Sequence, residues 1–145
     1  SDFAAEAEAA MGGFLGKIGL LAPRSTYPLG FHHAARITDH RLALVGDAAS
    51  NARPHMGFGV SKAACDAQAL ADALRDHDNI DTALAAYNHV RQPIGETIVK
   101  HSRKLGTHMG VNLQTEEDRA MHALLQNPRA MMDWIAVPNF LDAYR

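Results

Sequence analysis

The most informative position for chemistry is Asp47, because it lies where an apolar run meets a glycine-rich loop. The run at residues 42–45 is short and continuous, which is typical of a buried strand, and it ends in Gly46-Asp47. Such a strand delivers its last residues to the sheet edge at which open α/β sheets bind ligands. A carboxylate at that edge can accept hydrogen bonds from ligand hydroxyls. The spacing therefore predicts a ligand site at Asp47.

Two glycines, Gly57 and Gly59, follow directly before a long alanine-rich segment. Apolar residues recur at helical spacing over residues 60–74, so a helix is predicted there. Glycines at its start leave the backbone open to a ligand, and the first turn offers free N–H groups with a partial positive charge. Together with Asp47, these parts suit a planar, hydroxylated ligand that carries or develops negative charge.

Short strands and longer helices are predicted to hold this loop in place, which indicates an α/β or α+β fold. Strands are expected at residues 27–37 and 42–45. Helices are expected at residues 2–11, 60–74, 83–98, from the Thr115 cap onward, and around 130–134. Pro93 should kink the third of these helices or restart it. The buried face of the 60–74 helix is predicted to be Val60, Ala63, Ala64, Ala67, Leu70, Ala71 and Leu74.

Composition and charge narrow the class of protein. With 145 residues, 47% of them apolar, the chain can bury one ordinary core and lies outside the disordered class. Its net charge is −2 and its basic residues are scattered, which argues against nucleic acid or an anionic membrane as a partner. The single cysteine, Cys65, excludes an intrachain disulfide and favours a reducing compartment. No apolar stretch is long enough to span a membrane, so a cytoplasmic protein is expected, and a homodimer is left open.

The pattern around Asp47 belongs to a longer motif. Its members are Gly46-Asp47-Ala48-Ala49, Pro54, Gly57-x-Gly59, and Asp66-Ala67 with Leu70 and Leu74. This motif resembles the second FAD-binding motif of the class A flavoprotein aromatic monooxygenases, the relatives of p-hydroxybenzoate hydroxylase. Upstream, Tyr27-Pro28-Leu29 with Ala35 and Arg41 looks like the strand pair of the ubiquinone-biosynthesis hydroxylases. The string Arg53-Pro54-His55 looks most like the dihydroxypyridine hydroxylase branch, and Tyr87-x3-Arg91-x-Pro93 is similar to a recurrent helix of the family.

The resemblance implies FAD as cofactor and NADH or NADPH as cosubstrate, in a reaction that hydroxylates an aromatic or heteroaromatic ring with O2. In the family, the aspartate corresponding to Asp47 hydrogen-bonds the ribityl chain, and the loop around Pro54 lies against the isoalloxazine. The helix that begins near Gly57 directs its N-terminus at the pyrimidine edge. The implied cofactor-binding residues are Gly46, Asp47, Arg53, Pro54, Gly57, Gly59 and Ser61. His55 is assigned to substrate contact, and no residue is assigned as a catalytic base or a metal ligand.

Two departures from the family pattern bear on this assignment. The helix starts Gly59-Val60-Ser61, where most of the family has Gly-Leu-Asn. The chain also lacks the strand–Gly-x-Gly-x-x-Gly–helix unit that holds the ADP pyrophosphate. We therefore expect the C-terminal portion of a Rossmann-like FAD domain, inactive without an N-terminal FAD-binding segment. The expected division is a helical lead-in ending a substrate domain (1–26), the C-terminal half of the FAD-binding domain (27–105) and a C-terminal helical tail (106–145).

Other interpretations of the same residues stay open at this point. The chain could be a non-catalytic helical binding or assembly module that retains a vestigial flavin motif, or a flavin reductase or dehydrogenase that never activates oxygen. Asp47 could be an ordinary turn residue at the end of a strand. The nine histidines lack the spacing of metal ligands, and Ser61-Lys62 lacks the order of a phosphate-binding loop. The Met- and Trp-containing segment of residues 109–134 fits helical packing or an interface better than a substrate cavity.

Overall fold

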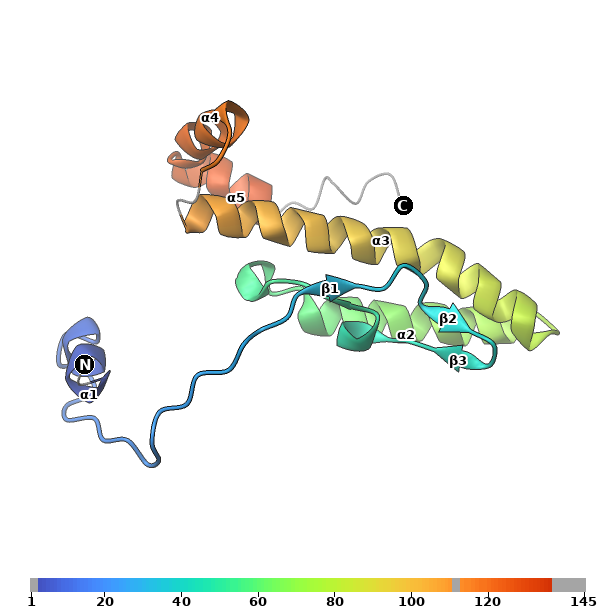
Figure 1. The fold of residues 1–145 in the computed structure, drawn as a ribbon, viewed down its shortest axis with the longest axis horizontal. Helices are drawn as coiled ribbons and strands as arrows, with labels where there is room; N and C mark the ends of the chain where they lie inside the picture. Colours follow the sequence, from blue (N-terminus) through green and yellow to red (C-terminus); the bar gives the residue numbers. More distant parts are fainter. Residues whose placement is uncertain (1–2, 111–112, 137–145) are drawn as a thin grey trace.

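The computed structural model describes residues 3–110 and 113–136 as short strands packed against long helices (Figure 1). The helices are α1 (Phe3–Ala10), α2 (Gly59–Asp76), α3 (Ile80–Met109), α4 (Glu116–Leu125) and α5 (Pro128–Ala136). The strands are β1 (His32–His33), β2 (Thr38–Asp39), β3 (Leu42–Ala43) and β4 (Ser50–Asn51), and the 3-10 turns are η1 (Gly46–Ala48) and η2 (Pro54–Met56). This architecture confirms the expected fold class. Within the described ranges, no helix is both long and apolar enough to cross a membrane.

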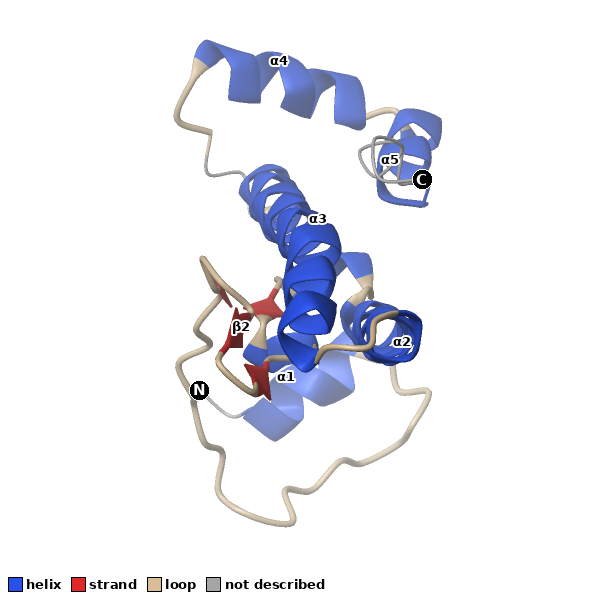
Figure 2. Ribbon diagram, turned by 90° about the vertical axis from the view of Figure 1, so that its right-hand side faces the viewer, coloured by secondary structure: helices blue, strands red, loops and turns tan. Residues whose placement is uncertain are grey.

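The helices α2 and α3 form the framework to which the strands attach (Figures 1 and 2). The Asn79 side chain accepts a 2.7 Å hydrogen bond from the Asp81 N–H and so caps the start of α3. The core contains Ala73 from α2 and Tyr87 from α3, together with Ile37 and Ala49. Burial raises the pKa of Tyr87 to about 12, so its hydroxyl stays protonated and donates a 2.8 Å hydrogen bond to the Leu44 carbonyl.

The strands are much shorter than the sequence predicts. β1 pairs with β4 and β2 pairs with β3, both antiparallel. Of the strand expected at residues 27–37, only β1 is in a ladder, and of the strand expected at 42–45, only Leu42–Ala43 forms a strand, β3. The burial expected for this run holds only in part, because Leu42 is 55% exposed whereas Leu44 and Val45 pack half-buried against the core. A continuous apolar run predicts burial only where neighbours lie on both faces.

The helix α2 buries a different face from the predicted one. Its buried residues are Lys62, Asp66 and Ala73, whereas Val60 is 86% exposed and Leu74 is 46% exposed. Of the predicted face, only Ala63 and Leu70 are half-buried. Hydrophobic periodicity missed the true face because two of its members are charged residues that are paired with each other.

The helix α3 runs from Ile80 to Met109 without a restart at Pro93. Proline cannot donate to the carbonyl four residues earlier; that residue is His89, which is exposed. Gly95 lies where β4 crosses the helix, and a Cβ atom there would come within 2.7 Å of the Ser50 hydroxyl oxygen. The absence of a side chain at Gly95 therefore lets the β1–β4 pair lie close to α3.

The C-terminal helices dock on α3 through aromatic rings. The expected cap at Thr115 is confirmed, since its hydroxyl accepts from the Asp118 N–H and the Asp118 carboxylate accepts from the Thr115 N–H, both at 3.0 Å. The indole of Trp134 lies 4.7 Å from the His101 ring and 5.5 Å from the His108 ring, measured between centroids. This segment therefore contributes helical packing against α3, and the tail beyond Ala136 lies outside the described residues.

This packing makes the stability of the protein depend on pH. Burial lowers the pKa of His101, a hydrogen bond with the Trp134 backbone partly opposes this shift, and the charge of Lys104 adds to it. The unfolded state then binds more protons than the folded state below an unfolded pKa of about 6.5. We expect the free energy of unfolding to fall as the pH drops from 7.5 to 5, measured by urea denaturation at each pH. His101→Asn should flatten this slope, whereas His89→Asn, at an exposed position on α3, should leave it unchanged; equal slopes in both variants would contradict the assignment.

Candidate functional site

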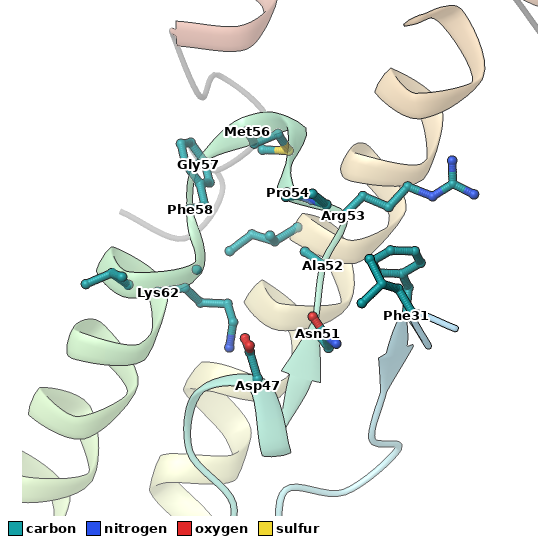
Figure 3. Close-up of a pocket in the computed structure, with 14 residues that line it drawn as sticks. Phe31, Asp47, Asn51, Ala52, Arg53, Pro54, Met56, Gly57, Phe58 and Lys62 are labelled. Atoms are coloured by element: carbon teal, nitrogen blue, oxygen red, sulfur yellow. The ribbon is translucent and has the colours of Figure 1, made fainter. Parts of the chain in front are cut away.

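A pocket of about 390 Å³ lies between η1, the loop around η2 and the start of α2 (Figure 3). Asp47 lines one side of it, and the loop from Arg53 to Gly59 lines another. Further walls come from Phe31 in the segment before β1, from Lys62 in α2 and from Ile98 in α3. The volume lies in the range of about 300–1,000 Å³ typical of small-molecule sites. Segments far apart in the sequence thus converge on one concave surface.

The backbone of Gly46 sets the position of Asp47. Gly46 has a φ of +63°, in the left-handed region that favours glycine, and a Cβ atom there would lie 3.1 Å from the Ala63 Cβ. Its N–H donates to the Asp66 carboxylate at 3.1 Å, and its carbonyl accepts from the Lys62 ammonium at 2.8 Å. Both sides of this residue are therefore held by α2, while Asp47 itself is exposed toward the pocket.

Behind Gly46 lies a buried ion cluster, which consists of Lys62, Asp66 and Arg91. The Lys62 ammonium contacts one Asp66 oxygen at 2.9 Å, and the Arg91 Nε contacts the other at 2.8 Å. The side chains of Lys62, Asp66 and Arg91 are 2%, 5% and 11% exposed. Charges at such depth are stable only when they are paired and hydrogen-bonded. The cluster therefore fixes η1, α2 and α3 relative to one another.

The loop around η2 is anchored to α3 by Arg53. The Arg53 N–H donates to the Ser102 hydroxyl at 3.1 Å, and its guanidinium carbon lies 5.5 Å from the centre of the Phe31 ring. A Cβ atom at Gly106 would overlap the Arg53 guanidinium, so the missing side chain there gives Arg53 its place on α3. In Figure 3 the Arg53 side chain extends away from Asp47. It therefore supports the loop, with its guanidinium group on the far side from the carboxylate.

The N-terminus of α2 opens on the pocket with its first N–H groups unused by the helix. The first intrahelical hydrogen bond is donated by Lys62 N–H to the Phe58 carbonyl at 2.8 Å, and no side chain caps the turn. The N–H groups of Gly59, Val60 and Ser61 precede that bond. A Cβ atom at Gly57 or Gly59 would meet nothing within 4 Å. The turn thus presents hydrogen-bond donors and partial positive charge beside open space.

The structure brings together five of the residues singled out in the sequence: Asp47, Arg53, Pro54, Gly57 and Gly59 all line the pocket. Gly46 is buried behind the wall. Ser61 is exposed outside the lining, and its hydroxyl donates to the Phe58 carbonyl at 3.3 Å. His55 is exposed and lies beside Gly106, outside the lining.

Sequence reasoning missed Lys62, which lines the pocket and supports Gly46 at the same time. The signal was present, because Lys62 and Asp66 are four residues apart on a predicted helix, the spacing of an ion pair. It also missed the apolar walls Phe31, Met56 and Phe58, which no motif marks. In the part of the chain that the structure describes, no group of three or more His, Cys, Asp or Glu residues could hold a metal ion.

Comparison with known proteins shows the family. A family model for the FAD binding domain matches residues 21–102, and the chain belongs to this family. Ubiquinone hydroxylase UbiL from Rhodospirillum rubrum is 37% identical over 97 residues, which are 63% of this chain and 23% of that protein. The resemblance seen in the motif around Asp47 is thereby confirmed.

Two solved structures share the architecture. PqsL from Pseudomonas aeruginosa, in complex with 2-aminobenzoylacetate, matches 88% of this chain and 32% of its own, with 31% identity and a TM-score of 0.57. The 2,6-dihydroxypyridine-3-hydroxylase from Arthrobacter nicotinovorans matches 54% of this chain and 20% of its own, with 26% identity and a TM-score of 0.52. The chain therefore spans between 20% and 32% of the length of these relatives.

The two left-handed glycines of the site offer a matched test of why Gly46 is glycine. Gly46→Ala and Gly57→Ala both place a side chain at a φ near +64°, but only Gly46 has a neighbour within 4 Å. Both should lose about 1–2 kcal/mol for the backbone conformation. Gly46→Ala should lose about 1–3 kcal/mol more for the contact with Ala63. Chemical denaturation measures the difference, and equal losses would show that the contact with Ala63 relaxes without effect.

Proposed function

We propose that this chain forms the flavin-facing wall of an FAD-dependent monooxygenase that hydroxylates an aromatic or heteroaromatic ring with O2 and NAD(P)H. The observation that carries the proposal is the pocket itself. It places the Asp47 carboxylate opposite the uncapped start of α2, in a chain of the FAD binding domain family. The similarity to hydroxylases supports the reaction class.

The residues present fit an FAD molecule on three counts. The Asp47 carboxylate is exposed toward the pocket, and no hydrogen bond to another described side chain occupies it, so it can accept from ribityl hydroxyls. The donors at Gly59 and Val60 match an acceptor edge such as that of the flavin pyrimidine. Apolar walls at Pro54, Met56 and Phe58 suit a planar ring.

Bound FAD supplies the electron transfer between NAD(P)H and O2, and the chain supplies binding and electrostatics. The positive end of α2 stabilises negative charge at the adjacent edge of the ligand. Pro54 and Gly57 shape the loop against which the ring lies, and Arg53 holds that loop on α3. In this proposal Gly46 acts through its backbone, and Ser61 fixes the first turn of α2. His55 lies on the outer face of the loop and contacts the substrate from there.

In a Rossmann-like domain the pyrophosphate of FAD is bound by a glycine-rich turn between a strand and a helix, and these residues do not contain that turn. No Gly-x-Gly-x-x-Gly unit occurs among the 145 residues, and the relatives are three to five times longer than the matched part. We propose that a separate segment provides this unit and that residues 27–105 complete the domain, with 1–26 ending a substrate domain and 106–145 forming a helical tail. The further partner is a small aromatic substrate, and a cytoplasmic setting agrees with the one free cysteine.

Product analysis distinguishes this function from that of a flavin reductase or dehydrogenase. The protein that carries the complete FAD domain is mixed with NADH or NADPH, O2 and a panel of hydroxylated benzoates and pyridines. A monooxygenase should release hydroxylated product in proportion to the reduced nicotinamide consumed. Nicotinamide oxidation that yields only peroxide with every aromatic compound would favour a reductase, and absence of flavin binding would favour a non-catalytic module.

Replacing Asp47 tests the cofactor contact directly. Asp47→Ala should raise the Kd for FAD about ten- to a hundredfold, because a hydrogen bond to a charged group contributes about 1.5–3 kcal/mol. The measurement is quenching of flavin fluorescence on titration of the apoprotein. Asp78→Ala, at an exposed position in the α2–α3 turn, is the control and should leave the Kd unchanged. An unaltered Kd in Asp47→Ala would remove Asp47 from the site.

A substitution at Gly59 separates an effect on folding stability from an effect on ligand affinity. A methyl group at Gly59 meets no atom of the chain, and its φ is not in the left-handed region. Gly59→Ala should therefore keep or slightly raise the melting temperature, since alanine is a better helix residue than glycine. The same methyl group projects from the backbone where the ligand approaches, so the Kd for FAD should rise at least tenfold. Unchanged affinity would show that the ligand does not contact this turn.

A further inference from the structure

The Lys62 ammonium is in an unusual position for a charged group. It is 2% exposed, lines the pocket, and contacts both the Asp66 carboxylate and the Gly46 carbonyl. Lys62 lies in the first turn of α2, where its own N–H donates the first helical hydrogen bond. One residue therefore joins the ligand-facing helix start to the backbone that carries Asp47. In Figure 3 the ends of the Lys62 and Asp47 side chains are drawn facing each other.

Stability alone does not call for this lysine. The pair formed by Asp66 and Arg91 is already balanced in charge, and it connects α2 with α3 across 25 residues of sequence. Lys62 adds a second buried cation to the same carboxylate, so the cluster carries an excess positive charge. Burying such a charge is unfavourable unless it makes good hydrogen bonds. The bond that Lys62 makes and Arg91 does not make is the one to Gly46.

We propose that Lys62 is a positioning residue for Asp47. By holding the Gly46 carbonyl while Asp66 holds the Gly46 N–H, it sets the orientation of the peptide unit from which the Asp47 carboxylate extends. The inference rests on the proposed function, since it takes the ligand of Asp47 to be the hydroxylated chain of a flavin. The Gly46 backbone lies close to α2, since a Cβ atom added at Gly46 would come within 3.1 Å of the Ala63 Cβ.

A double-mutant cycle tests the inference on the protein that carries the complete FAD domain. Lys62→Met, Asp47→Ala and the double variant are titrated with FAD, and the Kd values are compared. If Lys62 acts through Asp47, Lys62→Met should raise the Kd about tenfold in the parent protein but have little effect when Asp47 is already alanine. If the two increases multiply in the double variant, Lys62 acts on its own and the inference is overturned.

Arg91→Met separates positioning from general support of the fold. Arg91 contacts the same Asp66 carboxylate but not Gly46, so its loss should lower the melting temperature while its effect on the Kd stays independent of Asp47. A purely structural role for Lys62 predicts the same behaviour for Lys62→Met as for Arg91→Met. Lys100→Met, in an exposed ion pair with Glu96, is the surface control and should change neither quantity.

If Lys62→Met fails to fold, Lys62→Gln keeps a polar donor beside the Asp66 carboxylate while it removes the ammonium that holds the Gly46 carbonyl. Lys62→Gln is then combined with Asp47→Ala in the same way. If the increase in Kd caused by this substitution disappears when Asp47 is alanine, the positioning of Gly46 is supported. If the increases caused by the two substitutions multiply in the double variant, it is overturned. A parent Kd unaffected by Asp47→Ala alone would contradict the proposed function, a result distinct from failure of the cycle.

Discussion

The buried carboxylate of Asp66 is the interaction on which the rest of the site depends. It accepts from Lys62 on the same helix, from Arg91 on α3 and from the backbone of Gly46 in η1. An unpaired charge at this depth is strongly destabilising, so these three elements have a narrow range of relative placements. The pocket wall is a consequence of that requirement, because Asp47 directly follows the residue that Asp66 holds.

The polar groups of the site divide into two sets with different partners. Those behind the wall are satisfied within the chain, as in the contacts of Gly46 and in the hydrogen bond from Arg53 to Ser102. Those that face the pocket, the Asp47 carboxylate and the first N–H groups of α2, are left for a ligand. A rigid inner set and an open outer set give preorganised binding, since the ligand meets groups that do not need to rearrange.

Local patterns were sufficient for much of this arrangement. The sequence predicted that Asp47, Gly57 and Gly59 lie around one site, since their placement depends on a few neighbours, and it predicted the Thr115 cap for the same reason. Periodicity was misleading on α2, where it counted Val60 and Leu74 as core and overlooked Asp66 as a buried residue. Hydrophobicity scales assign a charged side chain to solvent and cannot include a partner that the fold brings from another helix.

The order of residues along the chain therefore indicates where the pocket forms, because the glycine loop and the helix start are short-range features. Packing settles which side chains support it, since Arg91 reaches Asp66 only after α2 and α3 dock. It also settles that His55 lies outside the pocket, as the loop crosses α3 at Gly106 with Arg53 and His55 on that side. These contacts join residues that are distant in sequence, and their energies exist only when the elements are assembled.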